Sequence, residues 1–418
     1  MTDKQKLLLI SLLVIHYIIL FFILNRSLDF LFNDASHRIG PGSDFFALYN
    51  AGKNWLLGNG IYMHGPGYGF RYHPILAMTI LSYISYFDYN PAYWIWVGIN
   101  EILFLATLYF IRKLIPEVKY YLIICSLLVF FSPYYLEIYM GNASFIVGTL
   151  LLIAFYYYRE KKDSKFFSLF IISILIKPIG LLFLPFLLLY RKYKIVILTI
   201  IIIFGLALPY FLIHPHDWIS FISVNFEGFP AKPGFLVHAG NQGFYALMLM
   251  VSAHINNIPN GQLYTLGQLP LWNSILIRAI PYFFVLISLW TTYRLRKSNR
   301  VDILIFIWTA TYLLGYKDIW EHTHSLLIFG MFFLYCSKQI NPKLLFISTA
   351  ALALPTAFVF YDITFYSGAF NDPGWHWSFP ISFVHHLSKP IWVLVLYIIV
   401  IVKSQRDLIS EISSSSET

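Results

Sequence analysis

Apolar runs long enough to cross a lipid bilayer recur along the whole sequence, and they constrain the fold more than any other feature. A transmembrane helix needs about 20 consecutive apolar residues. The chain is 58% hydrophobic and only 12% charged, whereas soluble domains carry about 25% charged residues. The runs are continuous rather than alternating, which is typical of helices and not of outer-membrane strands. The sequence therefore predicts an all-α polytopic membrane protein.

These runs predict a bundle of about 10–13 transmembrane helices. The candidate spans are residues 7–24, 74–87, 91–111, 120–133, 143–158, 166–190, 195–213, 273–293, 301–314, 323–336, 344–360 and 390–403. The span 74–87 is short, and 166–190 is interrupted by Lys177-Pro178. We interpret residues 1–405 as one membrane domain and residues 406–418 as a cytoplasmic tail.

The basic residues are concentrated in one set of connections. Twenty of the 29 Lys and Arg residues lie in the two terminal tails and in the connectors 112–119, 159–165, 191–194, 294–300 and 338–343. Cytoplasmic loops carry such an excess. The opposite side then holds residues 25–73 as a first external loop, 134–142, 214–272 as a large external loop, 315–322 and 361–389. This topology requires 74–87 and 166–190 to be re-entrant; if both cross fully, two basic connectors become external.

The external segments are rich in His, aromatic and amide side chains. Such a surface favours a site for a sugar or another hydroxylated substrate, because transporters place their ionisable residues within the spans. Within the first external loop, Phe45–Leu57 has helical periodicity and Gly58 follows it as a stop. This predicts an interfacial helix. Asp44 immediately precedes it and is either an N-cap or a general base.

Several segments, in order, resemble glycosyltransferase family 87, the polyprenyl-phosphate-mannose-dependent mannosyltransferases. The first is SDFFALYNAGKNWLLGNGIY with FRYHP. The family pattern here is an Asp-Phe pair, a following Tyr, Gly-x-x-Tyr and Tyr-x-Pro, and Gly58 and Gly60 before Tyr62 stand for its Gly-x-x-Tyr element. The others are YMGNASFIVGTLL, LIKPIGLLFLPFLLLYRKYK, GNQGFYALM and WEHTHSLL. Asn142 and Ser144 stand where the family pattern has Gln and Asn. The resemblance covers about residues 40–330.

The resemblance implies a GT-C superfamily bundle that takes a sugar from a polyprenyl-phosphate carrier on the non-cytoplasmic face and inverts its anomeric centre. Inverting transfer to a hydroxyl needs one carboxylate to accept the acceptor's proton, and Asp44 is the matching position. The matched motifs imply substrate contacts from Tyr49, Tyr62, Tyr72, Asn142, Asn241 and Gln242.

The lipid phosphate that leaves in such a reaction calls for cations or hydrogen-bond donors beside it. The candidates are Lys177, Arg278, His322 and His324. Lys177 and Arg278 stand in apolar segments, where a charge is costly without a function; alternatively, Arg278 snorkels and Lys177 accompanies a helix break. The Glu-His-Thr-His sequence at 321–324 lacks a third metal ligand at a suitable spacing. We expect no metal and no other cofactor.

The expected partners are a polyprenyl-phosphate-linked sugar, a glycolipid or envelope-glycan acceptor and membrane lipid, with no nucleic acid. The expected location is the bacterial plasma membrane, with the active site facing the exterior or periplasm. Two other classes stay open: a flippase or transporter of lipid-linked saccharides, and a non-catalytic scaffold or degenerate family member. The departures at Asn142 and Ser144 favour the last. The sequence does not specify the sugar, linkage or acceptor.

Overall fold

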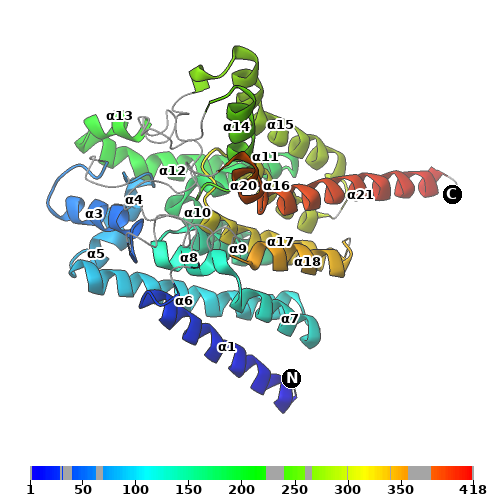
Figure 1. Ribbon diagram of the computed structural model, residues 1–418, viewed down its shortest axis with the longest axis horizontal. Helices are drawn as coiled ribbons and strands as arrows, with labels where there is room; N and C mark the ends of the chain where they lie inside the picture. The colour runs from blue at the N-terminus through cyan, green and yellow to red at the C-terminus, as the bar shows by residue number, and fades with distance from the viewer. Residues whose placement is uncertain are drawn as a thin grey trace.

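The computed structural model describes residues 2–28, 31, 40–62, 69–222, 240–258, 266–298, 300–338, 340–355 and 378–416. Helices dominate this part of the chain (Figure 1). The only β-type pairing in it is an isolated antiparallel bridge between Asn241 and Trp320. The predicted all-α polytopic membrane fold is confirmed.

The described helices follow one another along the chain as a series of long, short and broken elements. Their bounds are α1 Asp3–Leu24, α3 Phe45–Leu56, α4 Pro74–Leu76, η2 Ala77–Leu81, α5 Ser82–Ile84, α6 Tyr89–Leu114, α7 Val118–Val129, α8 Ser132–Met140, α9 Ser144–Arg159, α10 Asp163–Ile176, η3 Pro178–Phe183, α11 Leu184–Leu189, α12 Tyr193–Ile213, α13 His216–Ile222, α14 Phe244–Ile255, η7 Leu266–Gln268, α15 Leu271–Leu295, α16 Val301–Gly315, η8 Glu321–Leu326, α17 Leu327–Cys336, α18 Pro342–Ala353, α20 Phe379–Leu387 and α21 Pro390–Ser416.

Within the described residues, four helices are long and apolar enough to cross a membrane: α1, α6, α12 and α15. Two bent pairs, α7 with α8 at 46° and α20 with α21 at 47°, raise the number to six if each pair forms one span. Six shorter apolar segments of 10–17 residues accompany them. Several expected spans are therefore short or broken helices, an arrangement that membranes tolerate where backbone lines a cavity or is buried in protein.

The connectors with the excess of Lys and Arg meet at one end of the bundle, which we call the basic end. Three ion pairs join them: Arg159 Nη1 to Asp302 Oδ2 at 3.5 Å, Lys192 Nζ to Asp163 Oδ2 at 3.0 Å, and Arg300 Nη1 to Asp407 Oδ2 at 3.8 Å. Both chain termini point to the same side in Figure 1. The charge pattern thus predicted correctly that the connectors 159–165, 191–194 and 294–300 lie at the same end as the C-terminal part of α21.

The segment α10–η3–α11 enters and leaves at that same end. Asp163 begins α10, and Lys192, its ion-pair partner, lies just after α11. The segment therefore folds back on itself, as the re-entrant topology requires. Its turn is at Lys177, whose extended backbone (φ −148°, ψ 130°) precedes Pro178. A residue before proline is disfavoured in the helical region, so the Lys-Pro pair ends α10 deep in the bundle.

The segment 74–84 begins and finishes on the same side of the bundle too, but on the side opposite the basic end. The hydroxyl of Tyr89, at the start of α6, donates to Gly42 O at 2.6 Å. Nearby, the Tyr49 hydroxyl donates to Phe87 O at 3.0 Å, and Ser85 Oγ donates to Tyr49 O at 2.9 Å. The short segment α4–η2–α5 is thus held against α3, and α6 makes the crossing to the basic end.

Two boundaries differ from the sequence predictions. Residues 134–142 were expected to be an external loop, but α8 continues to Met140 because Gly141, with φ +73°, ends it. The predicted tail at 406–418 begins inside α21, which continues to Ser416. Parts of the predicted external segments 25–73, 214–272 and 361–389, and the last residues of the span 344–360, lie outside the described residues.

Candidate active site

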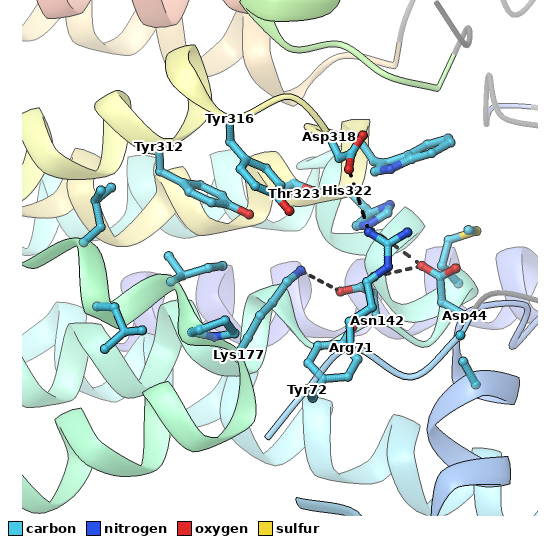
Figure 2. A pocket seen from close by; sticks show the side chains of 18 residues that line it. Asp44, Arg71, Tyr72, Asn142, Lys177, Tyr312, Tyr316, Asp318, His322 and Thr323 are labelled. Atoms are coloured by element: carbon cyan, nitrogen blue, oxygen red, sulfur yellow. Dashed lines mark hydrogen bonds and ion pairs between the residues drawn. The ribbon is translucent and has the colours of Figure 1, made fainter. Parts of the chain in front are cut away.

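A cavity of about 610 Å³ lies at the end of the bundle away from the basic connectors. Figure 2 shows the side chains that line it. Five segments distant in sequence supply its polar lining, through Asp44, Arg71, Asn142, Lys177 and His322. Pro178, Ile179, Leu181 and Leu182 supply an apolar wall. A concave site with convergent polar groups and an apolar wall is the usual form of a substrate pocket.

Asp44 is fixed by the backbone of α8 rather than by its own helix. Gly42 N–H donates to Tyr139 O at 2.7 Å, and Asp44 N–H donates to Met140 O at 2.8 Å. These carbonyls belong to the last turn of α8, where helix carbonyls lack intrahelical partners. Asp44 stands at the N-cap position of α3 with helical dihedrals, and its side chain makes no capping bond. The capping interpretation is therefore wrong, and the carboxylate faces the cavity.

Asn142 bridges the carboxylate and the lysine. Its Oδ1 accepts from Ala143 N–H at 2.7 Å and from Lys177 Nζ at 3.3 Å, which fixes the orientation of the amide. Its Nδ2 then donates to Asp44 Oδ2 at 2.8 Å. This contact holds the side chain of Asp44 in one position at the cavity.

Lys177 reaches the site from the tip of the re-entrant segment. Besides Asn142, its Nζ donates to Ser144 Oγ at 2.7 Å. Ser144 and Asn142, the two departures from the family pattern, are thus the two side chains that hold the lysine. Asn142 and Ser144 differ from the Gln and Asn of the family pattern, but both still supply an oxygen that accepts a hydrogen bond from the lysine.

His322 closes the other side of Asp44, with Nε2 at 4.0 Å from Asp44 Oδ2. Burial lowers the pKa of His322 well below its usual range, and the charges of Lys177 and His324 act in the same direction. The imidazole is therefore neutral at physiological pH. Its Nδ1 has no hydrogen-bond partner among the described residues.

Arg71 and three aromatic residues complete the cavity. Arg71 Nη1 lies 3.8 Å from Asp318 Oδ2. The rings of Tyr312 and Tyr316 stack at 5.2 Å between centroids. Burial raises the pKa of Tyr316 to about 12, as does Asp318 to a smaller degree, so its hydroxyl stays protonated. Burial likewise raises the pKa of Tyr72, the third aromatic residue. These hydroxyl groups can therefore donate hydrogen bonds to substrate oxygens.

Several of the predicted substrate contacts do not reach the cavity. Tyr49 bonds to Phe87 O. Tyr62 is buried behind Tyr72, whose carbonyl accepts from the Tyr62 hydroxyl at 2.7 Å. Asn241 and Gln242 are buried beneath the loop that carries Trp320 and His322. These four residues support the lining, whereas Tyr72 and Asn142 are part of it.

The loop below His322 is held by backbone pairing. Gln242 N–H donates to Ile319 O at 2.7 Å, Glu321 N–H donates to Gly240 O at 3.1 Å, and Asn241 Nδ2 donates to Lys317 O at 2.9 Å. The Glu321 carboxylate pairs with Lys389 Nζ at 3.5 Å, both side chains being buried.

The remaining predicted phosphate contacts lie outside the cavity lining. His324 is buried, and its Nδ1 contacts Glu321 O at 3.2 Å. Arg278 lies on an exposed part of α15. Within the part of the chain that the structure covers, no three His, Cys, Asp or Glu residues are grouped so that they could hold a metal ion.

Arg71, Asp318, Tyr312 and Tyr316 were not predicted as site residues. Arg71 immediately precedes the Tyr-His-Pro motif, and that position could have identified it. The other three belong to the end of α16 and the segment that follows it. Their proximity to Arg71 depends on the contact between Arg71 and Asp318, which are about 250 positions apart in the sequence.

Gly141 permits the close approach of α8 to Asp44. Its φ is +73°, and a Cβ there would lie 2.5 Å from Phe45 Cβ. We expect Gly141→Ala to strain the backbone by about 1–2 kcal/mol and to displace Phe45 together with Asp44. The activity measured in a transfer assay should fall about 100-fold, since small displacements of a reacting group have effects of that size.

Gly58→Ala is the matched control for this prediction. Gly58 has φ +72°, but no atom lies within 4 Å of a Cβ built there. The Gly58→Ala variant has the same backbone strain as Gly141→Ala but no contact to Phe45, so its activity should stay near that of the wild type. Equal losses in the two variants would show that strain alone, and not the position of Asp44, causes the effect.

The family model of glycosyltransferase family 87 matches residues 70–315. The matched region contains Arg71, Asn142 and Lys177, while Asp44 precedes it and His322 follows it. No curated protein matches the chain.

Proposed function

The chain belongs to glycosyltransferase family 87, and on that premise we propose that it transfers a sugar, with mannose as the first candidate, from a polyprenyl-phosphate carrier. The acceptor is a hydroxyl group of a glycolipid or envelope glycan. The observation that carries the proposal is the convergence of a fixed carboxylate, a half-buried lysine and an apolar wall in one cavity.

Asp44 is the general base in this proposal. The acceptor oxygen attacks the anomeric carbon, the bond from that carbon to the phosphate oxygen breaks, and the acceptor's proton passes to the Asp44 carboxylate. The attack occurs on the face opposite the phosphate, so the configuration inverts. Asn142 holds the carboxylate through its Nδ2, and neutral His322 limits the approach of water from the other side.

Lys177 and Arg71 stabilise the lipid phosphate that leaves. Both line the cavity, and a cation beside a leaving phosphate stabilises the negative charge as it develops. The phosphate carries the electron pair of the broken bond, so it needs no proton at departure. Arg278 and His324 have no part in this proposal, because they do not line the cavity.

The apolar wall is suited to the prenyl chain of the donor. Ile179, Leu181 and Leu182 come from η3 at the re-entrant turn, directly after Lys177. Leu181 is 37% exposed, so the wall reaches the surface of the molecule. A prenyl chain can lie against it while its phosphate meets the lysine. We further propose that this end of the bundle faces the periplasm or exterior of a bacterial plasma membrane, since the basic end would be cytoplasmic.

The test is a transfer assay with purified protein in proteoliposomes. Labelled polyprenyl-phosphate mannose should give a labelled glycolipid product, and the corresponding nucleotide sugar should give none. Equal transfer from the nucleotide sugar would contradict the proposed donor. Movement of the labelled lipid across the bilayer without any transfer would favour a flippase instead.

A further inference from the structure

A second concave surface lies between α7, α17 and α18, and none of its residues lines the candidate active-site cavity. Helix α18 packs against both α7 and α17, and Figure 1 shows the three helices. It is a groove of about 650 Å³. Its walls are almost entirely aliphatic and aromatic. They include Ile123 and Leu127 of α7, Met331 and Phe332 of α17, and Phe346 and Ile347 of α18.

The two ends of the groove differ in polarity. Both α7 and α18 begin at the basic end of the bundle, and α17 finishes there. As a result, the groove residues nearest that end are polar or amphipathic: Lys119, Tyr120, Tyr335, Asn341 and Lys343. Phe131, Ile328 and Thr349 line it farther along. The groove is therefore cationic at one end and apolar along its length.

The cationic end has the composition of a membrane interface. Lys119 and Lys343 are both exposed, and the rings of Tyr120 and Tyr335 lie 5.6 Å apart. Tyrosine is enriched where the hydrocarbon core meets the headgroups. The N-termini of α7 and α18 add positive potential there. Glu117 precedes α7 but does not line the groove.

The length of the groove corresponds to one leaflet. From Lys119 to Leu128, both of which line it, α7 rises about 14 Å. Half of a hydrocarbon core of about 30 Å is about 15 Å. A molecule with its charged group at the lysines and a chain along the groove would thus stay within a single leaflet.

We propose that this groove binds an anionic phospholipid, with its phosphate between Lys119 and Lys343 and one acyl chain along the apolar wall. Basic pockets between transmembrane helices on the cytoplasmic side bind anionic headgroups for the same electrostatic reason. This inference does not depend on the transferase activity, because no residue of the groove lines the catalytic cavity.

The experiment uses the full chain in detergent, to which phosphatidylglycerol or phosphatidylcholine is added. Native mass spectrometry measures bound lipid, and thermal unfolding measures the stabilisation that accompanies binding. Wild type should bind phosphatidylglycerol in preference to phosphatidylcholine. Lys119→Ala with Lys343→Ala should weaken phosphatidylglycerol binding about 10- to 30-fold, as expected from about 1 kcal/mol per lysine. Replacing both lysines by arginine should preserve it.

Two further variants separate the groove from general surface charge. Lys161→Ala with Lys162→Ala removes two lysines at the same end that do not line the groove, and it should leave binding unchanged. Ile347→Trp fills the groove and keeps both lysines, and it should weaken binding.

Four results would each overturn the proposal. The first is an equal loss of phosphatidylglycerol binding in the Lys119/Lys343 and Lys161/Lys162 variants, and the second is undiminished phosphatidylglycerol binding in Ile347→Trp. The third is equal binding of phosphatidylglycerol and phosphatidylcholine by wild type. The fourth is that inorganic phosphate stabilises the protein as much as phosphatidylglycerol does.

Discussion

Asp44→Asn is expected to reduce the turnover number for sugar transfer by about 10²- to 10⁴-fold, the usual contribution of a general base. The amide cannot accept the acceptor's proton at neutral pH. It keeps the size of the carboxylate and can still accept a hydrogen bond from Asn142 Nδ2, which lies 2.8 Å from Asp44 Oδ2 in the wild type. Donor binding should therefore change little, and the loss should appear in the turnover number rather than in the Michaelis constant.

The cavity contains a second carboxylate, so the assignment needs a direct comparison. Asp318 is 26% exposed and pairs with Arg71 at 3.8 Å, whereas Asp44 is held by a backbone and a side-chain contact. Asp318→Asn should weaken donor binding through Arg71 and affect turnover less. Full turnover in Asp44→Asn together with loss in Asp318→Asn would assign the base to Asp318. Asp163→Asn, at the basic end, controls for the general effect of removing a carboxylate.

The sequence was sufficient for features that depend on short-range chemistry. Periodicity and Gly58 located α3 almost to the residue, and Lys177-Pro178 located the break in the re-entrant segment. The charge rule grouped the basic connectors because it reflects how the whole chain inserts into a membrane. These predictions needed no knowledge of which helices are neighbours.

The contacts that define the site are long-range, and this is where sequence reasoning was insufficient. Asp44 resembled an N-cap because helix-capping rules consider only the following residues. The last turn of α8, almost 100 residues away, instead supplies its backbone partners. Arg71 and Asp318 were overlooked for the same reason, since neither residue has a distinctive neighbour until the fold brings them together.

The lysine at the tip of the re-entrant segment gives the second large prediction. Lys177→Met is expected to lower the catalytic efficiency for the polyprenyl-phosphate donor about 10²- to 10³-fold, comparable to removing an electrostatic contact to developing charge. Methionine keeps much of the length and the apolar stem, so the segment can still pack. Binding of the product analogue polyprenyl phosphate should weaken as well, because the phosphate loses the same cation. Lys177→Arg should retain part of the catalytic efficiency and part of the affinity for polyprenyl phosphate.

The alternative is that Lys177 serves only to orient Asn142 and Ser144. Ser144→Ala distinguishes the two roles, since it removes the lysine's 2.7 Å contact and leaves the charge in place. If the lysine contacts phosphate, Ser144→Ala should bind polyprenyl phosphate nearly as well as wild type. If the lysine is purely structural, Lys177→Met and Ser144→Ala should both reduce turnover and leave the affinity for polyprenyl phosphate unchanged. The affinity for the lipid phosphate, measured without any acceptor, therefore decides whether the charge placed beside Asp44 belongs to the chemistry or to the scaffold.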